Sequence, residues 1–125
     1  MSLAVWFSRL PQPASRLIYP ILRYTNLMRA VELRYLAPWV DDVRGWRVLD
    51  VGCGHGFYSL EFALDQASLD GCDLSSSDLK AARQTAQGVG VDGRANYLLA
   101  DGAMLPLAAN LYDLVVCNCV LEHIV

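Results

Sequence analysis

Three glycines at alternate positions are the residues of this sequence best suited to hold a ligand. Gly52, Gly54 and Gly56 directly follow the apolar stretch Val48–Val51 and precede a helix-forming run. Glycine has no β-carbon, so the backbone can turn sharply here and approach a ligand closely. The amides that open the next helix point into the same space and carry the positive end of its dipole. The turn, which also contains Cys53, therefore predicts a site for a flat or anionic group.

The details of this turn narrow the choice of ligand. A dinucleotide-binding fingerprint needs its third glycine at the sixth position, where this chain has Phe57. A phosphate-binding P-loop needs a Lys-Ser or Lys-Thr pair, and none follows the glycines. Asp50, two residues before the first glycine, would oppose a pyrophosphate with like charge. We therefore expect a ligand with a cationic end.

The elements that must position this turn alternate between strand and helix along the chain. Hydrophobic patterning predicts strands over residues 46–51, 68–74, 94–100 and 112–119. It predicts a helix over residues 56–66 that turns Leu60, Phe62, Ala63 and Leu64 toward the sheet. A second helix over residues 79–86 follows caps at 75–78 and ends at Gly88 and Gly90, and a third begins at residue 120. The alternation predicts an α/β fold, a Rossmann-like open parallel sheet with flanking helices and right-handed crossovers.

Polar side chains stand where the predicted strands end. Ligands of open parallel sheets bind beyond the carboxyl ends of the strands. Asp73 ends the second strand, where its carboxylate could accept hydrogen bonds from two ribose hydroxyls. Asp101 ends the third strand and could accept from an adenine amine, with the amides of Gly102 and Ala103 at the ring edge. A single acid at such a place is most often a turn or cap residue, but several in register with the glycines indicate a ligand site.

The remaining candidates complete this edge of the sheet. Leu74 and Met104 could enclose an adenine by apolar contact, and Asn118 and Cys119 end the fourth strand near the cationic part of the ligand. His123 could act as a base, but a histidine in the first turn of a helix more often bonds locally. His55 is more plausibly a loop residue, and Glu122 a solvated or structural one. No catalytic residue is therefore nominated.

Four segments together resemble a known family. The chain is similar to class I methyltransferases that depend on S-adenosylmethionine (SAM), in particular the methyltransferase type 11-like branch. Its first motif resembles residues 48–59, and its ribose-binding motif resembles residues 71–75. Its adenine-binding motif resembles residues 101–103, and its fourth motif resembles residues 112–123. The resemblance implies SAM as cofactor, bound by residues of the glycine turn and of the three later strand ends. These are Asp50, Gly52, Cys53, Gly54, Gly56, Asp73, Leu74, Asp101, Gly102, Ala103, Asn118 and Cys119.

The same resemblance implies an activity and an alternative to it. The Val-Leu-Glu-His ending of the fourth motif is similar to the branch that methylates small molecules and lipid-like quinones. The alternative is a domain that holds SAM or its product S-adenosylhomocysteine (SAH) without turnover. The resembled fold has seven strands, and this chain is expected to supply four. We therefore expect a domain truncated at its C-terminus, with an uncovered sheet face and self-association through the open edge of strand four.

Charge and composition divide the chain in two. Residues 1–40 carry five arginines against one glutamate, a net charge of +4, whereas residues 41–125 carry five basic and twelve acidic residues, a net charge of −7. This predicts a helical N-terminal lead over 1–40, which could contact a membrane surface, and a SAM-binding domain over 41–125. The acidic domain and scattered arginines disfavour a nucleic-acid partner. The cysteines lack paired metal-site spacing, so we expect no metal and reduced thiols in the cytoplasm.

Overall fold

The computed structural model describes residues 40, 42–118, 120 and 121 of this 125-residue chain. The predicted lead over 1–40 lies outside them apart from Val40, which packs against the core. The boundary at residue 41 therefore stays a prediction. The described residues also exclude Cys119, Glu122 and His123. Of the helix expected from residue 120, they include only residues 120 and 121.

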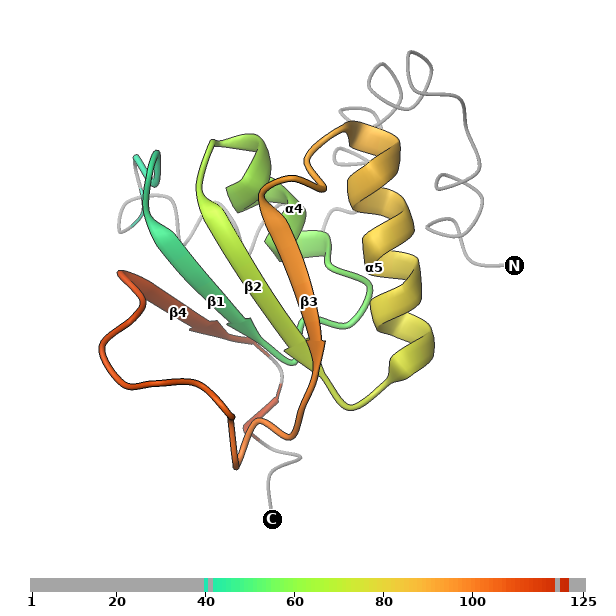
Figure 1. The fold of residues 1–125 in the computed structure, drawn as a ribbon, viewed down its shortest axis with the longest axis vertical. Helices are drawn as coiled ribbons and strands as arrows, with labels where there is room; N and C mark the ends of the chain where they lie inside the picture. The colour runs from blue at the N-terminus through green and yellow to red at the C-terminus, as the bar shows by residue number, and fades with distance from the viewer. Residues whose placement is uncertain (1–39, 41, 119, 122–125) are drawn as a thin grey trace.

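Four parallel strands form one open sheet, in the order β3-β2-β1-β4 (Figure 1). The strands are β1 (Arg47–Val51), β2 (Ser68–Asp73), β3 (Ala95–Leu99) and β4 (Leu114–Cys117). Val51 of β1 is in register with Cys72 of β2 and with Cys117 of β4. The carboxyl ends of all four strands therefore meet at one edge of the sheet, at the bottom of Figure 1. The expected α/β class and parallel arrangement are confirmed.

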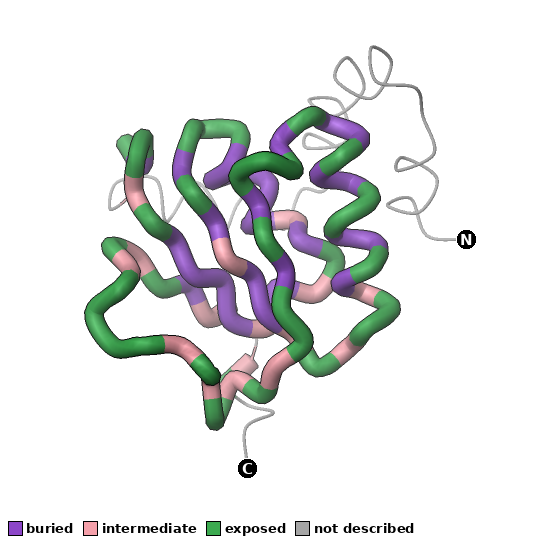
Figure 2. Tube along the Cα trace, in the orientation of Figure 1, coloured by how far each residue is buried: buried purple, intermediate pink, exposed green. Residues whose placement is uncertain are grey.

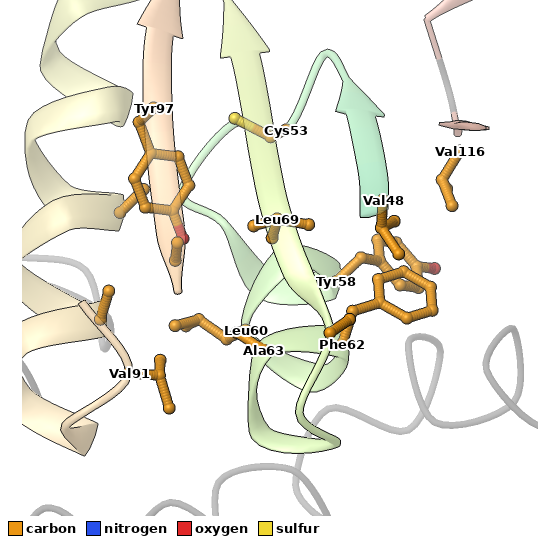
Figure 3. Packing of buried hydrophobic residues seen from close by; sticks show 14 of the residues in the cluster. Val48, Cys53, Tyr58, Leu60, Phe62, Ala63, Leu69, Val91, Tyr97 and Val116 are labelled. Atoms are coloured by element: carbon orange, nitrogen blue, oxygen red, sulfur yellow. The ribbon is translucent and has the colours of Figure 1, made fainter. Parts of the chain in front are cut away.

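In the part of the chain that the structure describes, two helices cover one face of the sheet. Helix α4 (Phe57–Leu64) follows the glycine turn, and α5 (Ser76–Val89) connects β2 to β3. Buried side chains of both helices form one cluster with Val48 of β1 and Leu69 of β2, shown in Figure 3. Leu60 and Leu69 are almost fully buried at its centre. Figure 2 shows that burial is concentrated in the central strands and the sheet-facing sides of the helices.

The ends of the helices correct the sequence-based bounds in small ways. The side chain of Ser75 accepts the amide of Asp78, so Ser75 alone is the N-cap, and residues 76–78 already belong to α5. Gly88 lies inside α5, and Gly90 ends it in a left-handed conformation. Leu64 was expected to face the sheet but is 39% exposed, because it is the last residue of a helix of only eight.

The second face of the sheet corrects a larger expectation. Leu49, Val51 and Cys72 are buried there by a group of residues that are mostly from the segment between β3 and β4: Ala100, Leu105, Leu107, Tyr112, Cys117 and Val120. The expectation of an uncovered face is therefore wrong for the centre of the sheet. It holds toward the margins, where Val115 of β4 is 56% exposed and Leu98 of β3 is 38% exposed.

Candidate functional site

The glycine turn is tied to the carboxyl end of β2 by backbone and side-chain hydrogen bonds. The amides of Gly52 and Cys53 both donate to the carbonyl of Cys72, at 2.8 and 3.0 Å. One residue later along each segment, the amide of Gly54 donates to Oδ2 of Asp73 at 2.8 Å. The other carboxylate oxygen of Asp73 accepts the amide of Ser75 at 2.8 Å. Asp73 therefore holds the turn and the start of α5 in one arrangement.

Each glycine of the turn faces a different environment. A β-carbon on Gly54 would meet nothing within 4 Å, so the space in front of this residue is open. A β-carbon on Gly56 would lie 2.8 Å from the Tyr97 hydroxyl and 3.0 Å from Cβ of Ala82. A β-carbon on Gly52 would lie 2.1 Å from Cγ2 of Val120. A side chain in place of Gly54 would therefore enter open space, whereas at Gly52 and Gly56 it would collide with the protein, and ligand contacts from the three backbones stay predictions.

Asp50 and Cys53 lie beneath the turn. Asp50 is 2% exposed, and its Oδ2 atom accepts the Ser59 hydroxyl at 2.6 Å. This bond joins β1 to α4, a role that the sequence did not reveal. The Cys53 thiol is buried and would lie 3.0 Å from a β-carbon on Gly71. Direct ligand contacts from these two side chains stay predictions. In the structure, both side chains support the turn from below.

The exit of β3 lies beside Asp73. The amide of Ala100 donates to the backbone carbonyl of Asp73, which places Asp101 next to the ribose-binding candidate. Asp101 is exposed and its Oδ1 atom accepts the Ala103 amide at 2.9 Å, closing a tight turn. An adenine contact from the Ala103 amide would have to replace this bond. Leu74 and Met104 are 72% and 80% exposed, so both apolar side chains are accessible for contact with a flat ligand.

Asn118 lies across β1 from these acids, at the end of β4. Its Nδ2 atom donates to the Tyr58 hydroxyl at 3.1 Å. The sequence gives no sign of this contact, since an aromatic ring such as that of Tyr58 at helical spacing predicts only a core position. His55 lies on the rim of the turn, and its Nε2 atom is 3.4 Å from Oδ1 of Asp78. His55 therefore lies beside the start of α5, and its interpretation as a loop residue stays a prediction.

A family model described as a methyltransferase domain matches residues 48–125, which is more than half of the chain. The chain belongs to this methyltransferase-domain family. It is 34% identical over 116 residues to an uncharacterized methyltransferase of Mycobacteroides abscessus, covering 93% of this chain and 44% of that protein. It is 38% identical over 101 residues to a ubiquinone biosynthesis O-methyltransferase of Bordetella parapertussis, covering 79% of this chain and 41% of that protein.

A solved structure supports the same membership. A SAM-dependent methyltransferase from Thiobacillus denitrificans, in complex with SAH, matches with a TM-score of 0.60 and 29% identity. The match covers 68% of this chain and 34% of that chain. This methyltransferase-domain chain therefore spans less than half the length of the relatives that it matches. Among the helices of its described part, none has the length and apolar character needed to cross a bilayer.

Buried acidic protons, among them those of Cys53 and Tyr97, are expected to make the stability of the methyltransferase domain sensitive to alkali. Burial raises the pKa of the Cys53 thiol well above its ordinary 9.0, and the negative charge of Asp50 raises it further. Burial likewise raises the pKa of Tyr97 above 10.0, and the neighbouring Cys53 adds to the shift. The Tyr97 hydroxyl lies near Ser59, but no hydrogen bond of good geometry joins it to a described residue.

We expect the free energy of unfolding to fall as the pH rises above 9. Below the ordinary pKa of each group, the folded and unfolded chains carry the same proton, so neither group contributes. Above it, the unfolded chain releases the proton whereas the folded chain keeps it, which costs up to about 1.4 kcal/mol per pH unit and group. Urea denaturation at pH 7.5, 9 and 10 measures the effect, and the Cys53→Ala variant should show a shallower fall. An equal slope in both proteins would contradict the assignment.

Proposed function

We propose that this chain binds SAM at the carboxyl edge of its sheet and serves the transfer of the SAM methyl group to a small-molecule or lipid-like acceptor. The observation that carries the proposal is the arrangement of Asp73. Its carboxylate holds the amide of Gly54, directly beside the open space in front of that glycine. Each carboxylate oxygen has a second lone pair, so Asp73 can still accept hydrogen bonds from a ribose.

The other proposed contacts fit the parts of the cofactor in order along the edge. Leu74 and Met104 offer apolar surface for the adenine, and Asp101 offers an acceptor for its amine. Asn118 follows β4, on the other side of β1, and we assign it to the sulfonium and amino-acid end. Asp50 and Cys53 support the turn from below, and Gly52, Gly56, Gly102 and Ala103 shape its surroundings. Cys119 belongs to the same proposal but lies outside the described residues.

The chemistry asks little of the protein's side chains. Bound SAM would supply a methyl group on a sulfonium, which is a good leaving group. The protein then has to hold the acceptor in line with that methyl and exclude water. This is consistent with a site whose polar residues serve binding, and we assign no catalytic residue.

Binding of SAM or SAH without turnover is the alternative function. The relatives named above include an O-methyltransferase, but this chain spans only 41% of it. The proposed cofactor contacts lie almost entirely among the described residues, whereas none of these residues is assigned to the acceptor. Transfer of a labelled methyl group from SAM to added phenols would support the enzyme, whereas tight SAH binding with no transfer would favour the binding module.

Titration calorimetry with SAH, and with NAD as the control ligand, tests the proposal. We expect a dissociation constant for SAH on the order of micromolar and no measurable heat with NAD. The difference follows from Phe57 and Asp50, which disfavour a pyrophosphate in the turn. Equal binding of both ligands, or binding of NAD alone, would refute the assignment of the cofactor.

We further propose that β4 mediates self-association. In the described sheet β4 pairs with β1 alone, and the side chains of β4 are all apolar, so no charge on this strand opposes pairing at its other edge. The opposite edge differs, because the Arg83 guanidinium donates to the Tyr97 carbonyl and protects β3. The proposed partners are therefore a small-molecule or lipid-like acceptor and a second copy of the chain, with no nucleic acid. Membrane contact by residues 1–40 and a cytoplasmic location remain parts of the same proposal.

The exposed side chains of the two edge strands provide a matched test of self-association. In sedimentation equilibrium, we expect the wild type to be heavier than a monomer and Val115→Lys on β4 to shift the mass toward the monomer. A lysine on an edge strand opposes strand pairing by its charge. Leu98→Lys on β3 should leave the mass unchanged. A monomeric wild type, or an equal effect of both lysines, would rule out β4 as the interface.

A further inference from the structure

The segment that follows β4 contacts both the glycine turn and helix α4. The Val120 side chain packs so closely on Gly52 that a β-carbon there would lie 2.1 Å from it. Asn118 donates from Nδ2 to the Tyr58 hydroxyl at 3.1 Å, which links residues 60 positions apart in the chain. The exit of β4 and the start of α4 are therefore one packed unit.

Tyr58 is built into the core on the β4 side of the molecule. It is the second residue of α4 and is 5% exposed. Figure 3 shows its ring beside Phe62, on the side of the cluster that carries Val48 and Val116. Tyr97, the other buried tyrosine of this cluster, lies on the opposite side with β3. The Tyr58 hydroxyl is thus a fixed point against which the Asn118 amide is oriented.

We propose that Tyr58 is a positioning residue that orients Asn118 toward the amino-acid end of the bound cofactor. The inference rests on the proposed function, because it concerns the same site. A planar amide that gives its NH₂ group to Tyr58 turns its Oδ1 atom in a different direction. A carbonyl oxygen is an acceptor, which suits an ammonium group or the polarised methyl groups beside a sulfonium.

The location of the pair predicts an effect on one end of the ligand only. Asp73, Leu74 and Asp101 lie on the β2 and β3 side of β1, and they are the residues proposed for the nucleoside. Asn118 lies on the β4 side. Loosening Asn118 should therefore weaken contacts with the amino-acid part of the ligand and leave those with the adenosine part intact.

Two ligands that share the nucleoside separate these effects. SAH carries the amino-acid end, whereas 5′-deoxy-5′-methylthioadenosine lacks it. For Tyr58→Phe we expect the dissociation constant of SAH to rise about five- to tenfold, as for the loss of one hydrogen bond that leaves its partner unsatisfied. The dissociation constant of methylthioadenosine should change less than about twofold. A purely structural role would weaken both ligands together.

Tyr97→Phe is the matched control, since it also removes one buried phenolic hydroxyl from the same cluster. That hydroxyl has no hydrogen-bond partner among the described residues, so both dissociation constants should stay within about twofold of wild type. In the Asn118→Ala background, Tyr58→Phe should have no further effect on SAH, because the shared bond is already absent. Circular dichroism of each variant checks that it is folded.

The outcomes separate the inference from the proposed function. If the wild type fails to bind SAH, the proposed function itself fails. If the wild type binds SAH and Tyr58→Phe binds both ligands as the wild type does, the positioning role of Tyr58 is overturned. It is also overturned if Tyr58→Phe weakens both ligands equally, or if Tyr97→Phe has the same selective effect.

Discussion

Asp73→Ala is expected to weaken SAH binding at least about 100-fold, because an ionised acceptor of two ribose hydrogen bonds is lost. The same change removes the acceptors of the Gly54 and Ser75 amides. We expect the free energy of unfolding to fall by about 2 kcal/mol, since hydrogen bonds to a charged group contribute more than neutral ones. Calorimetric titration and urea denaturation measure the two effects.

Two further variants test whether the contacts of Asp73 itself cause these losses of SAH affinity and stability. Asp73→Asn keeps an amide carbonyl as acceptor, so it should recover part of the stability and less of the affinity. Asp78→Ala removes a nearby carboxylate whose contact with His55 is exposed, and exposed ion pairs contribute at most about 1 kcal/mol. Its SAH affinity should remain within a few-fold of wild type. If Asp78→Ala were as damaging as Asp73→Ala, general charge around the turn would explain the result better than the specific contacts of Asp73.

Gly56→Ala is expected to lower mainly the stability of the protein, whereas Gly54→Ala is expected to lower mainly its affinity for the ligand. Gly56 has a φ of 75°, and an added β-carbon would meet the Tyr97 hydroxyl and Ala82. Left-handed backbone strain and overpacking together should lower the free energy of unfolding by about 3 kcal/mol. Gly54 has a φ of 51° but open space before it, so only the strain of about 1 kcal/mol applies to its stability.

Ligand affinity should follow the reverse order. In Gly54→Ala the new methyl group occupies the space proposed for the cofactor, so SAH binding should be lost from a folded protein. Gly56→Ala should bind SAH in proportion to the fraction that remains folded. Thermal denaturation measures the stability of each variant, and titration with SAH below the midpoint temperature then measures the affinity of the folded protein. Retained SAH binding in a folded Gly54→Ala protein would mean that the cofactor does not lie against this glycine.

The sequence was sufficient to predict the sheet, because alternating strand and helix patterns and crossover handedness leave few topologies. The four strands were predicted to within one or two residues at each end. The glycine turn was recognised because three glycines between a strand and a helix are locally distinctive. Fold and family could therefore be inferred from local patterns that lie close together in the chain.

The functions of individual glycines and acids could not be predicted in this way. Nothing near Gly56 in the sequence shows that Tyr97 and Ala82 pack against it, or that Val120 packs against Gly52. Likewise, the Tyr58 to Asn118 bond depends on how α4 lies on β4. These contacts come from the packing of elements far apart in the chain, and hydrophobic periodicity does not specify them.

We propose that the cofactor binds at the carboxyl edge of the sheet, against Gly54 and between Asp73 and Asn118. A ¹H–¹⁵N correlation spectrum of the labelled chain, recorded with and without SAH, tests it most directly. We predict that the amides of Gly54, Ser75 and Gly102 shift, whereas those of Gly93 and Asn96, near the amino end of β3, do not. Shifts confined to the amino ends of the strands, or a spectrum unchanged by SAH, would contradict the account.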